Sequence, residues 1–249
     1  EVKGPAAVDK NSATVIDGIA APVERKKKKR ITLAVGIAAA LCLCIVGGVC
    51  LAAILSGTSP ATGGDASAGD TDSTADSAET TYTPTALDEA LTYYADIEIA
   101  DYGTITIQLD QSSAPVTAAN FVSLAESGFY DGLTFHRIME GFMMQGGDPN
   151  GDGTGGSENT IVGEFSDNGY ENSLSHTRGA VSMARSGDDY DSASSQFFIV
   201  QEDSTFLDGQ YAVFGYVTEG LEVVDAVCEA AEPTDDNGTI EAEAQPVIT

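Results

Sequence analysis

The second half of the chain consists of short runs in which apolar and polar residues alternate, a pattern typical of half-buried strands. The runs 95–99 and 105–109 both alternate in this way, and Asp101-Tyr102-Gly103 lies between them. Two such runs joined by a short turn that contains glycine predict a β-hairpin. Five further apolar runs are predicted as strands: 133–138, 142–145, 180–184, 196–200 and 212–217.

Two segments have the spacing of helices instead. Pro115 suits the first turn of a helix, and apolar residues recur on one face from there until Gly128, which ends the pattern. Residues 218–231 form a second helical pattern with Leu221 and Val224 on its inner face. Two helices cannot cover both faces of an open parallel sheet, so a mostly antiparallel barrel capped by helices is expected.

The first third of the chain is organised differently. Residues 1–30 form a polar tail that ends in a basic cluster, and residues 31–55 contain no charge. A run of this length exceeds the roughly 20 residues that cross a bilayer, which predicts a single transmembrane helix over 31–55. Residues 56–85 are rich in Ser, Thr, Gly, Ala and Asp and are predicted to be a disordered linker, and 86–249 form the globular domain.

A signal peptide and a lipoprotein anchor both fit the apolar run less well. A cleavable signal peptide has an apolar region of only about 7–15 residues and a small-residue cleavage site, and no convincing site follows here. A lipoprotein anchor is disfavoured because Leu43 or Val49 occupies the place of a small residue before a cysteine. An uncleaved span with basic residues before it predicts a cytoplasmic N-terminus and a domain outside the cytoplasm, held at the cell membrane.

Charge and cysteine content narrow the function further. The formal net charge is −28, and after residue 30 only three arginines accompany 35 acidic residues, so nucleic-acid binding is not expected. Three of the four cysteines lie in 31–55, which leaves Cys228 with no disulfide partner in the domain. Cys42 and Cys44 have no further ligands at metal-binding spacing, so no metal site is predicted.

The stretch 135–148 places Arg137 among apolar residues such as Phe142 and Met143, beside Gln145. An isolated polar group in apolar surroundings is typical of a small-molecule or peptide site. Four segments then occur in order: 135–138 (Phe-His-Arg-Ile), 141–148 (Gly-Phe-Met-Met-Gln-Gly-Gly-Asp), 195–199 (Ser-Gln-Phe-Phe-Ile) and 207–215 (Leu-Asp-Gly-Gln-Tyr-Ala-Val-Phe-Gly). Together they resemble the cyclophilin family of peptidyl-prolyl cis-trans isomerases over about residues 95–226.

The resemblance implies a mainly β fold, an eight-stranded antiparallel barrel closed by two helices, and a monomer that needs no metal or organic cofactor. It implies that Arg137 is catalytic. It also implies that proline-containing segments of secreted or surface proteins are the partners. Substrate-binding residues by motif match are His136, Phe142, Met143, Gln145, Ala184, Gln196, Phe198, Phe206, Leu207 and Tyr211.

Physical chemistry agrees with the role implied for Arg137. Rotation about an Xaa-Pro bond is slow because amide resonance sets a barrier of roughly 18–20 kcal/mol. A guanidinium that donates to the nitrogen of the twisted amide would stabilise this state over the planar one. Alternative functions are a weakly catalytic module that binds proline-containing segments and a surface scaffold. The replacement of a common proline by Glu140 and the long acidic loop 187–193 keep these alternatives open.

Some residues are expected to have structural roles instead. Phe197 should point inward, because neighbours on a strand face opposite ways, and Phe198 outward. His136 is expected to be a hydrogen-bonded barrel residue, and His176, Arg178 and Arg185 are expected on surface loops.

Residues 151–156 match a dinucleotide-binding glycine pattern, and 148–153 imitate the start of a calcium loop. The glycine pattern lacks the strand-turn-helix context that a dinucleotide site requires. The calcium pattern lacks the acid twelve positions on. Neither dinucleotide binding nor calcium binding is therefore expected of this segment. A turn after Gly-Gly-Asp explains both motif matches.

Overall fold

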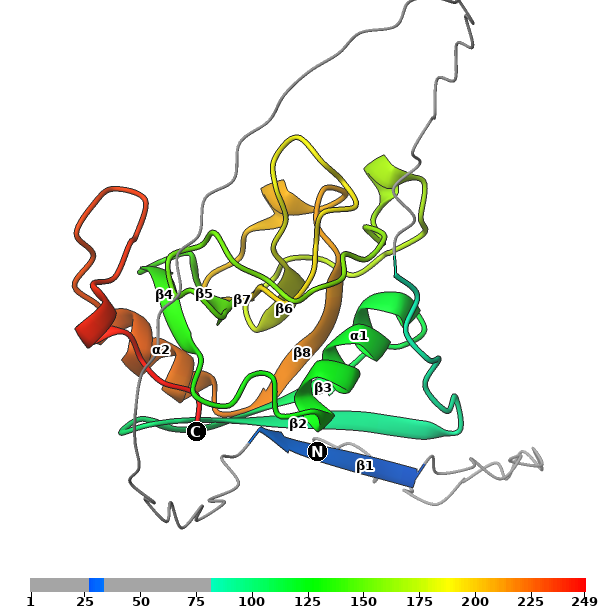
Figure 1. The fold of residues 1–249 in the computed structure, drawn as a ribbon, viewed down its shortest axis with the longest axis horizontal. Helices are drawn as coiled ribbons and strands as arrows, with labels where there is room; N and C mark the ends of the chain where they lie inside the picture. Colours follow the sequence, from blue (N-terminus) through cyan, green and yellow to red (C-terminus); the bar gives the residue numbers. More distant parts are fainter. Residues whose placement is uncertain (1–26, 34–81) are drawn as a thin grey trace, which may run out of the picture.

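A computed structural model describes residues 27–33 and 82–249 (Figure 1). Its strands are β1 (Lys27–Leu33), β2 (Leu91–Ile99), β3 (Gly103–Leu109), β4 (Thr134–Met139), β5 (Met143–Asp148), β6 (Ala180–Met183), β7 (Phe197–Val200) and β8 (Val213–Glu219). Its α-helices are α1 (Pro115–Glu126) and α2 (Leu221–Ala230), and its 3-10 helices are η1 (Ser166–Asn168), η2 (Thr205–Leu207) and η3 (Ala242–Ala244).

The strands form one sheet in the order β1-β2-β3-β8-β6-β7-β5-β4. Residues near the C-terminus join the two sides of this sheet, because Ile248 bridges to Ile99 of β2 and Val247 bridges to Thr134 of β4. The sheet therefore curls, with α1 and α2 on opposite sides of it in Figure 1. The expected mainly β architecture with eight strands and two helices is confirmed.

One strand differs from the expectation. The eighth strand, β1, comes from the basic cluster and pairs in parallel with β2, whereas all other pairs are antiparallel. Lys29 forms an ion pair with Glu126 at the end of α1, and Arg30 lies 3.7 Å from the carboxylate of Asp96. Ion pairs between basic residues of β1 and acidic residues of the domain thus form where β1 packs against the domain.

The predicted transmembrane helix overlaps this strand. Residues 31–33 lie in β1, and residues 34–55 lie outside the described residues, as do the tail up to residue 26 and the linker up to residue 81. Among the two segments that the structure describes, no helix combines the length and apolar character needed to cross a membrane.

The main core lies inside the curled sheet, and aromatic rings fill its centre. The ring centroid of Phe121 in α1 lies 5.2 Å from those of Tyr130 and Phe214 and 5.5 Å from that of Phe197. Phe197 belongs to this core, whereas its neighbour Phe198 packs in a second, smaller apolar cluster with Met143. The predicted inward and outward orientations of the two phenylalanines are confirmed.

Helix α1 begins without a side-chain cap of its own, because Ala114 occupies the cap position. The carboxylate of Glu164 supplies the missing acceptor from a distant loop. It accepts hydrogen bonds from the backbone N–H groups of Val116 (3.0 Å) and Thr117 (2.8 Å) and from the Thr117 hydroxyl (2.7 Å). A negative charge at a helix N-terminus also interacts favourably with the helix dipole.

Candidate active site

A cavity of about 230 Å³ lies over the second apolar cluster. It is lined by Arg137, Phe142, Met143, Gln145, Ala184, Arg185, Phe198, Leu207 and Tyr211. The fold thus brings together residues from β4, β5, β7 and η2, from the turn between β4 and β5, and from the segments that follow β6 and η2. Eight of the eleven site residues expected from the sequence line this cavity, and Arg185 was not among those expected.

Arg137 reaches the cavity from β4, where it pairs in register with Gln145 of β5. Its Nε donates to the carbonyl of Asn237 (2.7 Å), and its Nη1 donates to Oε1 of Gln145 (3.2 Å). Its Nη2 lies 3.3 Å from the sulfur of Met139. Partial burial lowers the pKa of Arg137, while Tyr211 and Asp235 oppose that shift. The guanidinium is therefore oriented by neighbours on several sides while it borders the cavity.

The apolar wall of the cavity is closely packed. The side chains of Met143 and Phe198 are almost fully buried, and the Tyr211 ring meets the Phe198 ring edge-on at 5.9 Å. Phe206 differs, because it is 67% exposed and does not line the cavity. Its ring lies 5.7 Å from that of Phe142, which places it at the outer border of the site.

Gln145 connects Arg137 to the glycine-rich segment through Gln196. The Gln145 amide donates to Oε1 of Gln196 (2.9 Å), and the Gln196 amide donates to the carbonyls of Gly153 (3.1 Å) and Gly155 (2.7 Å). Gln196 lines a second, polar cavity of about 370 Å³, which shares Gln145, Ala184 and Arg185 with the first. The two cavities are therefore neighbours along one continuous wall.

The glycine-rich segment after β5 is folded around the carboxylate of Asp148. That carboxylate accepts hydrogen bonds from the backbone N–H groups of Asn150 (2.8 Å), Asp152 (3.2 Å) and Gly153 (2.6 Å). A turn of this kind accounts for the two motif matches in the segment. Within the described ranges, no group of three or more His, Cys, Asp or Glu side chains is arranged to bind a metal ion.

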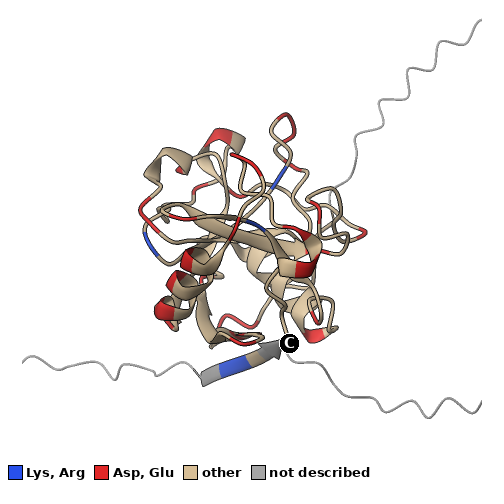
Figure 2. Cartoon of the chain, turned by 90° about the vertical axis from the view of Figure 1, so that its left-hand side faces the viewer, with Lys and Arg blue, Asp and Glu red and all other residues tan. Residues whose placement is uncertain are grey.

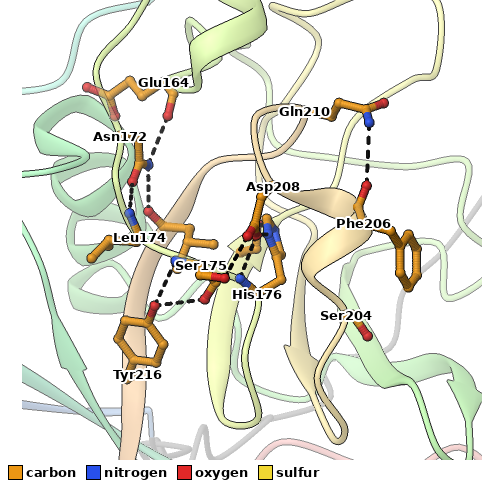
Figure 3. A network of polar contacts seen from close by, with 12 residues as sticks. Glu164, Asn172, Leu174, Ser175, His176, Ser204, Phe206, Asp208, Gln210 and Tyr216 are labelled. Carbon is orange, nitrogen blue, oxygen red and sulfur yellow. Dashed lines mark hydrogen bonds and ion pairs between the residues drawn. The ribbon is translucent and has the colours of Figure 1, made fainter.

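The expectation that His176 lies on the surface is wrong. Its side chain is fully buried, and Figure 3 shows it next to Asp208. Its Nδ1 lies 2.7 Å from a carboxylate oxygen of Asp208, and its Nε2 lies 3.0 Å from the hydroxyl of Ser182. The ring also stacks on Phe198, with centroids 5.9 Å apart, and so supports the cavity wall from behind.

The surroundings of His176 and Asp208 determine their protonation states. Burial lowers the pKa of His176, and its bonds to Asp208 offset that shift only in part, which leaves the ring neutral near pH 7. Burial raises the pKa of Asp208, but hydrogen bonds from Ser175 and His176 outweigh it, so the pKa falls and the group is a carboxylate. The neutral ring therefore donates from Nδ1 to Asp208 and accepts from Ser182 at Nε2. Ser182 and His176 are both fully buried, so these two side chains support the fold and do not meet a substrate, whereas the Asp208 side chain is partly exposed.

The expectation for His136 is wrong in one respect. The side chain is buried, as a barrel residue should be, but neither ring nitrogen has a hydrogen-bond partner in the described part of the chain. Burial lowers the pKa of His136, which keeps the ring neutral. It lies behind the glycine-rich segment and does not line the 230 Å³ cavity.

The three arginines of the domain lie in different surroundings. Arg178 is at the surface, as expected, where it forms a two-point ion pair with Asp225 at 2.9 and 2.7 Å. Arg185 is only partly exposed and lines both cavities, which the sequence did not indicate. Glu140 lines a separate hollow with Arg178 and Asp225, away from Arg137.

Comparisons with known proteins agree with this geometry. Residues 94–246 match the family model for cyclophilin type peptidyl-prolyl cis-trans isomerases. Peptidyl-prolyl cis-trans isomerase B of Bacillus subtilis is 49% identical over 124 residues, which cover 50% of this chain and 82% of the relative. A Helicobacter pylori peptidyl-prolyl cis-trans isomerase is 45% identical over 140 residues, which cover 55% of this chain and 82% of the relative.

Solved structures show the same fold. A cyclophilin type peptidyl-prolyl cis-trans isomerase of Cryptosporidium parvum, crystallised in the presence of the dipeptide Ala-Pro, aligns with a TM-score of 0.54 and 30% identity. The alignment covers 61% of this chain and 93% of that one. A curled eight-stranded sheet with two helices, the matched family model and close relatives lead to one conclusion: the chain belongs to the cyclophilin-type peptidyl-prolyl cis-trans isomerases.

Proposed function

We propose that this isomerase accelerates rotation about Xaa-Pro bonds in proteins outside the cytoplasm, with Arg137 as the catalytic donor. The observation that carries the proposal is the position of the Arg137 guanidinium at the border of an apolar cavity, 3.2 Å from Oε1 of Gln145. Two cationic side chains, Arg137 and Arg185, and the amide of Gln145 line the cavity together with aromatic and aliphatic side chains. This is the chemistry that a proline ring and its adjoining amide require.

The reaction needs no covalent intermediate. In the planar amide the nitrogen lone pair is delocalised into the carbonyl, and in the twisted amide the lone pair returns to the nitrogen. A fixed cation beside that nitrogen stabilises the twisted state more than the planar state, which lowers the barrier. Phe142, Met143, Phe198 and Leu207 would hold the proline ring while the other side of the bond turns.

Peptide binding along the adjoining wall is part of the same proposal. Gln145, Ala184 and Gln196 would position the substrate backbone, and Tyr211 and Phe206 would border the site. The relative from Cryptosporidium parvum supports a proline-containing ligand, since its structure was determined with Ala-Pro present. His136 contributes indirectly, as a buried neighbour of the segment that Gln196 holds.

The activity is tested by nuclear magnetic resonance exchange spectroscopy on a short Ala-Pro peptide with the full chain. The proposal predicts that cis and trans signals exchange faster when the protein is added, and that peptide binding is seen as shifted signals. Binding without faster exchange would favour a module that only holds proline-containing segments. A folded protein that neither binds nor accelerates would contradict the assignment of the site.

The location is proposed from the sequence. After β1, residues 34–55 still provide 22 residues without a charge, enough for one bilayer span of about 20 residues. If this segment crossed a membrane, β1 and residues 82–249 would lie on opposite sides of it. Within one molecule, the pairing of β1 with β2 and a membrane span over residues 34–55 therefore exclude each other.

The proposed location is tested by protease protection. The full chain carrying a C-terminal epitope is expressed in bacterial cells, the cell wall is removed, and protease is added outside. The proposal predicts that the epitope sediments with membranes and is digested while a cytoplasmic marker protein survives. An epitope that stays protected until the cells are lysed would contradict it.

A further inference from the structure

Arg185 stands between the two cavities of the site. It lines both the apolar cavity that contains Arg137 and the polar cavity of about 370 Å³ next to it. Among the described residues that line the polar cavity it is the one charged side chain, and the others are glycines, serines, Ala184, Thr154 and the two glutamines Gln145 and Gln196. A cation beside serine and threonine hydroxyls is suited to an anionic group.

The guanidinium is held in place by aromatic rings. Its central carbon lies 4.7 Å from the ring centroid of Tyr211, 4.8 Å from that of Tyr190 and 5.3 Å from that of Phe165. Its Nε donates to the carbonyl of Gln210 (2.9 Å), and its Nη1 donates to the carbonyls of Ser186 (2.7 Å) and Gly187 (3.3 Å). Such stacking and fixed donors give an arginine a defined orientation before a ligand arrives.

The charge of Arg185 is not neutralised by a neighbouring carboxylate. Across residues 27–33 and 82–249, no acidic side chain lies within ion-pair distance of it, whereas Arg178 is paired with Asp225. Two acidic side chains of the following loop have other contacts: Asp191 accepts hydrogen bonds from Gly163 (2.9 Å) and Asn168 (2.8 Å), and Asp189 accepts one from the backbone N–H of Asp191 (2.9 Å). The Nη2 of Arg185 has no hydrogen-bond acceptor among the described residues, so this nitrogen is the donor available to an incoming anion.

We infer that Arg185 determines substrate specificity by selecting an acidic side chain close to the proline. This inference rests on the proposed function, because it assumes that the proline ring occupies the apolar cavity. An extended peptide advances about 3.3 Å per residue, so a residue one or two positions from the proline reaches the adjoining polar cavity. There the carboxylate of Asp or Glu meets the guanidinium of Arg185 and the hydroxyls around it.

The negative charge of the rest of the domain opposes the binding of an acidic peptide, so a preference for an acidic side chain must come from a local contact. Residues 82–249 contain 30 acidic residues and three arginines, and Figure 2 shows acidic residues spread widely over the domain. The overall field therefore repels acidic peptides, and only a contact at short range can favour them. Raising the salt concentration should weaken the repulsion more than the close contact.

The experiment measures kcat/KM of the full chain for peptides that differ at one residue. Glu or Gln is placed at each of the two positions before and the two positions after proline, in an otherwise neutral sequence. Glu and Gln have nearly the same size, so their ratio isolates the charge. We expect a Glu-to-Gln ratio of roughly three to ten at one or both positions on one side of the proline.

Variants then assign the effect to Arg185. In Arg185→Gln the ratio should fall to about one or below, and in Arg185→Glu a peptide with Lys at that position should be preferred over one with Glu. Arg178→Gln changes the net charge by the same amount outside both cavities, and it should keep the wild-type ratio.

Three results distinguish the outcomes. A ratio near one in the wild type at all four positions, or an unchanged ratio in Arg185→Gln, overturns the inference while leaving the isomerase activity in place. A ratio that falls equally in Arg178→Gln also overturns it, because the effect would then be one of net charge. No acceleration of any peptide by the wild type would instead refute the proposed function.

Discussion

The guanidinium of Arg137 and the side-chain amide of Gln145 lie 3.2 Å apart on paired positions of β4 and β5. Gln145 in turn donates to Gln196, which holds the glycine-rich segment through Gly153 and Gly155. The donor that we propose to act on the amide is thus connected to the polar side of the site by a row of hydrogen bonds.

Replacing Gln145 should therefore slow catalysis without unfolding the domain. We predict that Gln145→Leu lowers kcat/KM about tenfold, because one hydrogen bond to a charged group is lost and Arg137 becomes less well oriented. The control is Gln108→Leu, on β3, whose side chain bonds to Tyr94 at the surface. Equal rates for wild type and Gln145→Leu would show that this contact has no part in catalysis.

Phe197 and Phe198 provide a matched pair for separating stability from binding. Phe197 is fully buried in the main core, so Phe197→Ala should lower the free energy of unfolding by about 3–5 kcal/mol. Phe198 lines the cavity, so Phe198→Ala should reduce peptide affinity by a larger factor than any variant outside the site. Urea denaturation and peptide titration measure the two effects. A Phe198 variant that binds peptide as tightly as the wild type would contradict the proposed proline pocket.

Glu164 should be needed for the stability of α1. We predict that Glu164→Ala lowers the free energy of unfolding by about 2–4 kcal/mol, since three donors, two of them buried, lose their acceptor. Glu222 offers a comparison, because it lies exposed in the first turn of α2, and Glu222→Ala should cost less than about 1 kcal/mol. Similar urea midpoints for the two variants would argue against this role of Glu164.

The buried histidines should make stability depend on pH. Burial lowers the folded-state pKa of His176 below its ordinary value of 6.5, so the unfolded chain binds more protons as the pH falls below that value. The stabilisation is complete above about pH 6.5 and is lost progressively from there toward the lower, folded-state pKa. His136 should contribute in the same direction.

This prediction is tested by the difference in thermal unfolding midpoint between the wild type and a His176 variant. Thermal unfolding of wild type and His176→Gln is compared from pH 7.5 to pH 5, so that titrations common to both cancel. The gap between the two midpoints should narrow as the pH falls. A gap that stays constant, or widens, would mean that His176 does not titrate as its burial indicates.

Local patterns in the sequence predicted the elements that depend on local chemistry. The alternation in 95–109, the proline at the start of α1 and the strands expected over 133–138 and 142–145 all reappear. Motif order also indicated which residues would meet in one cavity.

Contacts between distant residues could not be predicted in this way. Glu164 caps a helix that begins nearly fifty residues earlier, and no local signal marks it as a cap. His176 and Asp208 are 32 residues apart, and His176 appears in the sequence only as a histidine in a polar stretch. Arg185 becomes a site residue because Phe165, Tyr190 and Tyr211 converge on it from three segments. The pairing of β1 with β2 depends in the same way on a partner more than sixty residues away.

The catalytic role of Arg137 is tested most directly by cis-trans exchange rates of an Ala-Pro peptide with the wild type, Arg137→Gln and Arg178→Gln, all confirmed as folded by circular dichroism. We predict that Arg137→Gln lowers kcat/KM about 100-fold or more, as expected when a donor to the transition state is removed, and that Arg178→Gln matches the wild type. An Arg137→Gln protein that retains kcat/KM within about threefold of the wild type would contradict the catalytic role of Arg137, because a loss that small is below what one such donor supplies.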